Sequence, residues 1–408
     1  MTVFPLRPAQ QRQLFLIASG VSTAGSFAGI TAKGWILMKG GVDPFVLALN
    51  FAALSLPTLL ISGPAGVRTD RVGCERVLVQ AQWALLAAAG LGALAIPLLE
   101  GTAQVLLLLF STLLVGIAGA YELTARNKYC SILVEQPKQL AGYLTSFSVV
   151  FNVGKLVGPP IGGLLVAATG PAWALGIDAA SYLFPIASVM FLLTPERSRE
   201  VRSQAGSDAS LLSAWRNCGS TLRGVLCLTA ALCVIGFYHP GLAPLIAFEQ
   251  LGAKPTDLGL FTSVLAAGSI VGGVVLQRNS SRFCQRPFLT LGGFGMVTAI
   301  AQLGMARTTG VGFSLAMAFL IGAGTAGLLS SCNLITQIGS PQEMRGRMAG
   351  LSQIAFLGGG GISGLLAALL VKTTSLSTAF GLTGGLSVAV ALIWMRQQGD
   401  KTLQLRSG

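Results

Sequence analysis

Six ionisable side chains lie within long apolar stretches of the sequence and are the first candidates for chemistry: Lys33, Glu122, Arg126, Lys155, Asp178 and His239. A charge inside a membrane is costly, so a group that is kept there usually binds a substrate, forms an ion pair or relays a proton. We therefore take these six side chains as candidates for binding the substrate or protons.

The two lysines differ in their predicted depth. Lys155 lies near the middle of an apolar run from about Tyr143 to Val166, too deep for its ammonium to reach water easily, and this favours a role in a cavity or an ion pair. Lys33 lies near the outer end of the first apolar run. Its side chain can snorkel to the interface or face a cavity, and both interpretations stay open.

The acidic residues offer partners for these cations. Asp178 can pair with Lys155, or it can cap polar backbone near the outer interface. Glu122 and Arg126 are four residues apart, so they can pair on one face of a helix. We expect a structural pair or a gate there in preference to a proton carrier.

His239 is the only histidine and precedes Pro240 within an apolar run. The proline predicts a broken helix, where backbone groups and an imidazole can face water and relay protons. A lone histidine is more often a hydrogen-bonded packing residue, so this second interpretation stays beside the first.

Glycines recur every fourth residue in the stretch Gly154-Lys-Leu-Val-Gly158-Pro159-Pro-Ile-Gly162-Gly163. This spacing places Gly154, Gly158 and Gly162 on one helical face, where a second backbone can approach closely. Pro159 removes a hydrogen bond from the same helix. The pattern predicts a helix that rocks against a partner.

A second motif reads Gly66-Val-Arg-Thr-Asp70-Arg71-Val-Gly73, in the predicted loop after the second apolar run. Gly66 permits close helix approach and Gly73 turns the chain. We expect Asp70 to hold an inner gate by charge-assisted contacts with Arg71 or with a neighbouring helix end.

The elements that position these residues follow from the composition. Of the 408 residues, 52% are hydrophobic and 10% are charged, against about 25% charged in a soluble domain. The sequence therefore predicts an all-α polytopic membrane protein. Twelve apolar runs are long enough to span a bilayer, at roughly 14–38, 45–65, 77–98, 103–125, 142–166, 172–193, 222–248, 257–277, 287–306, 311–335, 348–371 and 376–395.

The basic residues predict the topology. If the N-terminus is cytoplasmic, 21 of the 27 Lys and Arg residues lie on the cytoplasmic side, and the positive-inside rule then places both termini there. The same dispersed residues account for the net charge of +13 without nucleic acid. The seven cysteines are odd in number, and we expect no structural disulfide among them.

The chain divides into two similar halves. The polar segment 194–220 predicts a cytoplasmic linker between six-helix bundles at 1–193 and 221–408. The stretches Pro137-Lys-Gln-Leu-Ala-Gly-Tyr-Leu144 and Pro341-Gln-Glu-Met-Arg-Gly-Arg-Met348 match at equivalent places before the fifth run of each half. A duplicated six-helix unit explains both observations.

The motif from Gly66 to Gly73 resembles the signature of the major facilitator superfamily, and the motif from Gly154 to Gly163 resembles the helix-five motif of its exporters. Cys74 and Glu75 stand where the family usually has basic residues, and Thr145 stands where a glycine is expected. The chain is most similar to the bacterial twelve-helix branch that holds the enterobactin exporter, macrolide efflux pumps and the lysophospholipid transporter. The segments that carry this similarity are Leu56-Pro-Thr-Leu-Leu60, Glu122-Leu-Thr-Ala-Arg126, Phe151-Asn-Val-Gly-Lys-Leu-Val-Gly-Pro159 and Pro341-Gln-Glu-Met-Arg-Gly-Arg347.

The resemblance implies a secondary transporter of the bacterial inner membrane that works by alternating access around a central cavity, with protons as the default coupling ion. The sequence has no ATP-binding loop, metal constellation or nucleophile elbow, so we expect neither a cofactor nor an enzyme. Siderophore export is the leading hypothesis, because Lys33 and Lys155 offer cations to an anionic ligand. Drug efflux is the alternative, and a lysophospholipid flippase is the third.

The expected partners are a small-molecule substrate and membrane lipid, with no nucleic acid. Whether an outer-membrane export component is a further partner stays open. We expect the protein to be a monomer.

Overall fold

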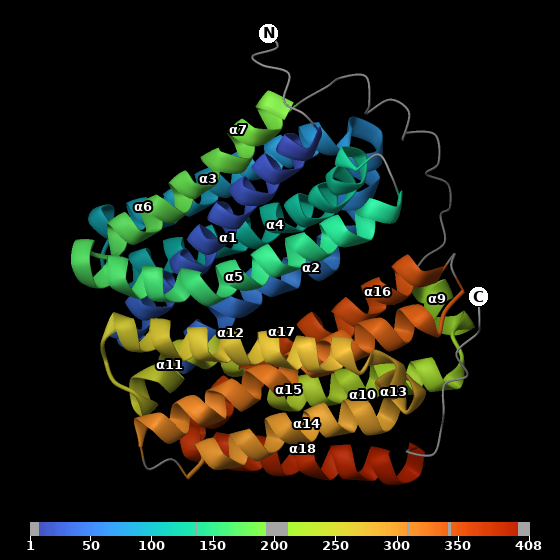
Figure 1. Ribbon diagram of the computed structural model, residues 1–408. Coiled ribbons are helices and arrows are strands. Elements are labelled where there is room, and N and C mark those ends of the chain that lie inside the picture. The colour runs from blue at the N-terminus through green and yellow to red at the C-terminus, as the bar shows by residue number, and fades with distance from the viewer. Residues whose placement is uncertain (1–7, 135–136, 193–210, 308–309, 342–343, 399–408) are drawn as a thin grey trace. The chain divides into compact units, whose positions relative to one another are not determined.

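The computed structural model describes residues 8–134, 137–192, 211–307, 310–341 and 344–398. All regular structure within these ranges is helical (Figure 1), which confirms the predicted all-α class. Twelve candidate membrane spans occur there, in agreement with the twelve predicted apolar runs.

The chain forms two compact units. The first unit contains Met1–Gly41, Ala53–Gly206 and Lys254–Ser263, and the second contains Val42–Ala52, Ser207–Ala253 and Val264–Gly408. The predicted bundle boundaries at 193 and 221 stay a prediction, since residues 194–210 of the linker lie outside the described ranges. Its remainder contains a short helix, α9 (Leu211–Asn217), which the polar composition did not indicate.

The helices of the first unit are α1 (Pro8–Lys39), α3 (Cys74–Leu98), α4 (Gly101–Leu133), α5 (Pro137–Thr169), α6 (Pro171–Ser181) and α7 (Leu183–Leu192). α1 packs against α5 and α6, and α3 packs against α4 and α6. Gly170 has a φ of +88° between α5 and α6, a backbone conformation that favours glycine, and Pro171 then starts α6. α6 and α7 together make one candidate span.

The second unit contains α10 (Ser220–Gly236), α11 (His239–Gln250), α13 (Ser280–Gln285), α14 (Pro287–Met305), α15 (Val311–Ile338), α16 (Arg345–Gln353), α17 (Gly359–Thr373) and α18 (Leu376–Gln398). Two further helices, α2 (Pro44–Val72) and α12 (Pro255–Arg278), have residues in both units. α14 packs against α15 and α18, and α10 packs against α17 and α18. A buried apolar cluster that includes Leu228, Phe288 and Leu291 lies between these helices.

Two spans of the second unit are not continuous α-helices. α10 ends at Gly236 and α11 begins at His239 with Pro240 in its first turn, which confirms the predicted break. A π-helical turn, Ile354–Gly358, separates α16 from α17. Such turns are rare and often lie at functional sites, and the apolar pattern gave no sign of this one.

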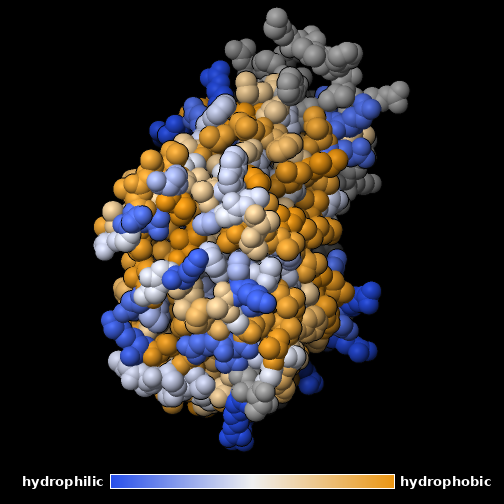
Figure 2. All heavy atoms as spheres, turned by 90° about the vertical axis from the view of Figure 1, so that its left-hand side faces the viewer, coloured by the Kyte–Doolittle hydropathy of each residue, from blue (hydrophilic) through white to orange (hydrophobic). Residues whose placement is uncertain are grey.

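Large apolar side chains are exposed over much of the surface, as expected for helices that face lipid. Leu60, Leu98 and Leu164 are 79%, 69% and 59% exposed. Figure 2 shows broad apolar areas beside hydrophilic residues on the face that it presents.

Candidate functional site

A buried polar site in the first unit is centred on Lys33 of α1. Its side chain is 5% exposed, and its Nζ donates hydrogen bonds to Ser111 Oγ at 2.8 Å and to Thr112 Oγ1 at 3.4 Å, both on α4. Ser111 donates its own proton to the carbonyl oxygen of Ala88 at 2.7 Å, so its lone pairs face the ammonium. The alternative in which Lys33 snorkels to the interface is therefore wrong.

Gly92 of α3 makes room for this arrangement. A Cβ at this position would lie 2.7 Å from Ser111 Oγ, closer than real Cβ contacts allow, and 3.1 Å from Lys33 Cε, which is a tight contact. A residue with any side chain at position 92 would displace the lysine or its partner.

Asp178 of α6 is the acidic member of the site. It is 6% exposed, and its carboxylate lies against Gly29 of α1, where a Cβ would overlap its oxygen Oδ2. Gly29 and Lys33 are one helical turn apart, so the carboxylate lies on the same side of α1 as the ammonium, although the two described side chains form no ion pair within 4 Å. One of the two alternatives for Asp178, a pair with Lys155, is thus not found among the described residues, because the packing of α6 on α1 places Asp178 against Gly29.

Asp178 does not serve as a cap. It lies within α6 and not at its end, and its Oδ1 atom is buried without a hydrogen-bond partner among the described residues. A buried carboxylate oxygen with spare capacity can accept a proton or a donor group of a ligand. This property distinguishes Asp178 from a carboxylate that is fully used in packing.

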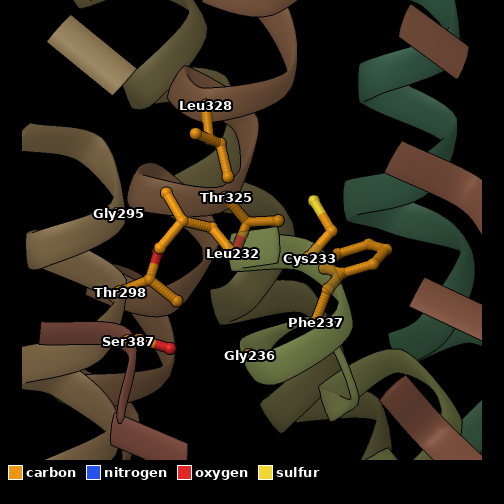
Figure 3. Close-up of a pocket in the computed structure, with 9 residues that line it drawn as sticks. All are labelled: Leu232, Cys233, Gly236, Phe237, Gly295, Thr298, Thr325, Leu328 and Ser387. Carbon is orange, nitrogen blue, oxygen red and sulfur yellow. The ribbon is translucent and has the colours of Figure 1, made fainter. Parts of the chain in front are cut away.

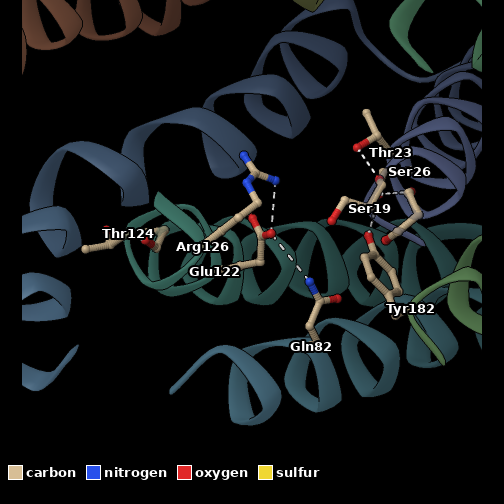
Figure 4. A network of polar contacts seen from close by, with 10 residues as sticks. Ser19, Thr23, Ser26, Gln82, Glu122, Thr124, Arg126 and Tyr182 are labelled. Carbon is tan, nitrogen blue, oxygen red and sulfur yellow. Dashed lines mark hydrogen bonds and ion pairs between the residues drawn. The ribbon is translucent and has the colours of Figure 1, made fainter. Parts of the chain in front are cut away.

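Tyr182 extends the site toward the middle of α1. Its hydroxyl lies 2.9 Å from Ser26 Oγ, and Ser26 Oγ lies 2.9 Å from the carbonyl oxygen of Ser22 (Figure 4). Tyr182 also interacts electrostatically with Asp178. The sequence contained no signal for Tyr182 or Ser111, since both are ordinary residues of apolar helices.

Glu122 and Arg126 form the predicted pair on α4. Arg126 Nη1 lies 3.0 Å from Glu122 Oε1, and Gln82 Nε2 of α3 donates to the same oxygen at 3.4 Å (Figure 4). The two side chains are 17% and 13% exposed. Two donors to one carboxylate fit the structural pair or gate that we expected.

The glycine face of α5 packs directly against the backbone of α1, as the spacing predicted. A Cβ at Gly158 would lie 2.6 Å from the carbonyl oxygen of Ala24, and one at Gly162 would lie 2.5 Å from that of Ala28. At Gly154 the nearest atom would be Thr23 Cγ2, at 2.8 Å. We call this contact the glycine seam; it leaves no room for any side chain at these three positions.

The neighbours of the seam residues are placed as follows. Pro159 and Gly163 are buried, and α5 continues as one helix through Pro159. Lys155 is half-buried on α5, directly after Gly154. Its role in a cavity or an ion pair stays a prediction.

The motif at the end of α2 differs in part from the prediction. Residues 66–72 are helical and not a loop, and Gly73, with a φ of +102°, makes the turn alone. A Cβ at Gly66 would meet no atom of the described residues within 4 Å, so these residues show no close approach of another helix there. Arg71 is exposed.

Asp70 forms an ion pair with Lys128 of α4. We expected Arg71 or a neighbouring helix end as its partner; the partner lies in the last two turns of α4, 58 positions further along the chain. The side chains of Lys128 and Asp70 are 24% and 42% exposed. An ion pair of this exposure contributes less than about 1 kcal/mol to stability, so a gating role would show in transport and not in abundance.

Replacement of Asp70 by Asn is expected to reduce transport several-fold with near-normal abundance, and Lys128→Gln should do the same. The exchanged pair, Asp70→Lys with Lys128→Asp, should recover much of the activity because it restores the attraction. Substrate efflux and immunoblots of membranes measure the two quantities. Unchanged efflux in both single variants would remove the gating role.

His239 begins α11 and is fully buried. Its ring packs edge-on against Phe237, with the centroids 5.0 Å apart. The predicted exposure of this imidazole to water at the helix break is therefore not found. A packing role and a proton relay both remain hypotheses.

Comparisons with known proteins agree with this architecture. The family model of transmembrane secretion effectors matches residues 2–403. The chain is 25% identical to the multidrug efflux pump Tap of Mycolicibacterium fortuitum over 389 residues, which cover 90% of this chain and 91% of the pump. It is 29% identical to the enterobactin exporter EntS of Citrobacter koseri over 279 residues, which cover 64% and 61%.

Solved transporters share the fold. A D323A mutant of the nucleoside transporter NupG aligns with a TM-score of 0.76 and 13% identity over 95% of this chain and 99% of its own. A bacterial homologue of the human lysosomal transporter Spinster aligns with a TM-score of 0.69 and 14% identity, over 95% of both chains. With twelve candidate spans and a match over nearly its whole length, the chain is an integral bacterial membrane protein that belongs to the transmembrane secretion effectors, exporters of the major facilitator superfamily.

Proposed function

We propose that this protein is a proton-driven exporter of small organic molecules with a broad, multidrug type of substrate range. It works by alternating access at the bacterial inner membrane, with both termini in the cytoplasm. The family and the nearly full-length similarity to a multidrug pump support the direction and the substrate class.

Two buried ionisable groups carry the proposal of proton coupling: Lys33, and Asp178, which lies against Gly29 one helical turn away on α1. We call them the buried pair. An ammonium and a carboxylate in a membrane helix bundle stabilise each other only while both are charged. A proton that binds to Asp178 removes its charge. The electrostatic attraction between Asp178 on α6 and Lys33 on α1 is then lost. Proton binding would therefore change the packing of α1 with α6. Because α1 also contacts α5 through the glycine seam, the change would reach that contact as well.

The same pair favours drugs over siderophores as substrates. Siderophore export rested on free cations for an anionic ligand, but Lys33 already donates to Ser111 and has the buried carboxylate of Asp178 one helical turn away along α1. The first unit therefore offers a nearly neutral polar site within apolar walls, which suits amphipathic organic molecules.

Siderophore export stays the second candidate, on one specific observation. The chain resembles the enterobactin exporter over about two thirds of its length. Lys155, half-buried beside the glycine seam, could then offer the ammonium to a catecholate or carboxylate.

Inverted membrane vesicles from a host without its own efflux pumps test the proposal. Acidification of the vesicle interior should drive uptake of a cationic dye such as ethidium, and nigericin should abolish it because it collapses the pH gradient. Vesicles without the protein are the control. Uptake that survives nigericin would contradict proton coupling; no uptake of any dye or drug, with secretion of a catecholate by intact cells, would establish the second candidate instead.

A further inference from the structure

The interrupted seventh span creates a polar point inside the second unit. α10 ends at Gly236, and the carbonyl oxygen of this residue accepts a hydrogen bond from Gln302 Nε2 of α14 at 2.6 Å. The carbonyl end of a helix carries a partial negative charge and oxygen atoms that the next turn does not use. The end of α10 at Gly236 therefore places a partial negative charge within an apolar helix bundle.

Two buried side-chain oxygens face this helix end without hydrogen-bond partners. Gln302 is fully buried and Ser387 of α18 is 4% exposed; Gln302 Oε1 and Ser387 Oγ have no partner among the described residues. A Cβ placed on Gly236 would lie 3.3 Å from Ser387 Oγ and 3.5 Å from Gln302 Oε1. Both oxygens therefore lie beside the same residue.

A small cavity is lined by two of these residues, Gly236 and Ser387, while Gln302 holds the Gly236 carbonyl and is not part of the lining. The cavity measures about 10 Å³, the room of one water molecule or one unhydrated ion. Four helices line it, and Figure 3 shows Ser387 and Thr298 reaching toward the space beside α10. The lining residues are Leu232, Cys233, Gly236, Phe237, Gly295, Thr298, Thr325, Leu328 and Ser387.

The polar groups around the cavity are mainly acceptors. Thr325 donates its proton to the carbonyl oxygen of Ile321 at 2.7 Å, and Thr298 donates to that of Phe294 at 3.3 Å. Toward the cavity these two hydroxyls therefore offer lone pairs, as acceptors or as ligands of a cation. None of the lining residues is ionisable except Cys233. An excess of neutral oxygens at a negative helix end suits a small, hard cation.

We propose that this cavity is a binding site for a small monovalent cation, sodium, formed by the end of α10 with the hydroxyl oxygens of Ser387, Thr298 and Thr325. Gln302 positions the Gly236 carbonyl beside it. The ligands are neutral oxygens, so the site takes a single charge and discriminates by size. The proposal goes beyond the exporter function, because it requires only binding and holds whether or not transport uses sodium.

Thermal unfolding of the purified protein in lipid nanodiscs, followed by tryptophan fluorescence, tests sodium binding. Addition of sodium chloride should raise the midpoint saturably by about 3 °C or more. Equal concentrations of potassium or choline chloride should not. Equal midpoints in all three salts would mean that the cavity holds only water, and would overturn the proposal.

Variants then locate the site. Ser387→Ala should weaken the apparent sodium affinity about tenfold, the value of one lost contact to a charged group. Gln302→Leu should act in the same direction and is the second variant if one of them fails to fold. Ser363→Ala is the matched control, since Ser363 is 1% exposed, also lacks a partner among the described residues, and does not line the cavity.

The outcomes separate this proposal from the exporter function. A sodium response that both variants retain unchanged would place the ion elsewhere and overturn the proposal. Proton-driven dye uptake in sodium-free buffer is measured independently, so either proposal can fail while the other stands.

Discussion

A leucine at position 158 is expected to stop turnover while the protein still reaches the membrane. The glycine seam has no space there, because even a Cβ would lie 2.6 Å from the carbonyl oxygen of Ala24 and 2.7 Å from Phe27 Cβ. Overpacking costs about 1–3 kcal/mol, and each 1.4 kcal/mol on a barrier is about a tenfold change in rate. If α5 must move along α1 during transport, turnover should fall at least about tenfold.

Dye uptake in inverted vesicles measures turnover, and dye binding to the purified variant shows whether the site survives. Gly158→Ala should have a smaller effect in the same direction. Gly90→Leu on α3 is the matched control, because a Cβ at Gly90 would meet no atom within 4 Å. Wild-type turnover in Gly158→Leu would show that the seam plays no part in transport.

Removal of one charge from the buried pair, Lys33 and Asp178, should strongly lower the stability of the folded protein. Asp178→Asn leaves the Lys33 ammonium buried without its counter-charge, a loss of about 3–5 kcal/mol for pairs of this kind. We expect low abundance and a low unfolding temperature. Lys33→Met should also destabilise the protein, because it leaves the carboxylate alone.

The double variant Lys33→Met with Asp178→Asn separates structure from coupling. It removes both charges and should regain abundance, since a buried pair is often no more stable than neutral residues in its place. Its dye transport should no longer follow the pH gradient. The matched control is Glu122→Gln with Arg126→Gln, a pair in the same unit that should leave coupling intact. Gradient-driven uptake of wild-type strength in the Lys33 and Asp178 double variant would reduce the buried pair to a structural role.

The parts of the fold that depend on the sequence of a single segment were predictable. Run length predicted the twelve spans, the fourfold glycine spacing predicted the α5 seam, and Pro240 predicted the break before α11. Each of these follows from local physical chemistry: apolar length, a missing side chain or a missing amide proton.

The partners of the charged residues were not predictable in the same way. Asp178 was left open between a pair with Lys155 and a capping role, and Asp70 between Arg71 and a neighbouring helix end, whereas the structure places Asp178 against Gly29, one helical turn from Lys33, and pairs Asp70 with Lys128. Which helices pack together is a property of the whole bundle, and one sequence does not reveal it.

The break at Gly236 also has a consequence for how the protein is made. α10 has 17 residues and α11 has 12, about 25 and 18 Å at 1.5 Å per residue, so neither crosses a hydrocarbon core of about 30 Å alone. The seventh span must therefore enter the bilayer as one piece with its defect inside. The side chain that pairs the Gly236 carbonyl belongs to Gln302, 66 residues further along the chain. During synthesis the Gly236 carbonyl therefore lacks this partner until the ninth span has been inserted. Until then it needs another hydrogen-bond donor, from the insertion machinery or from water.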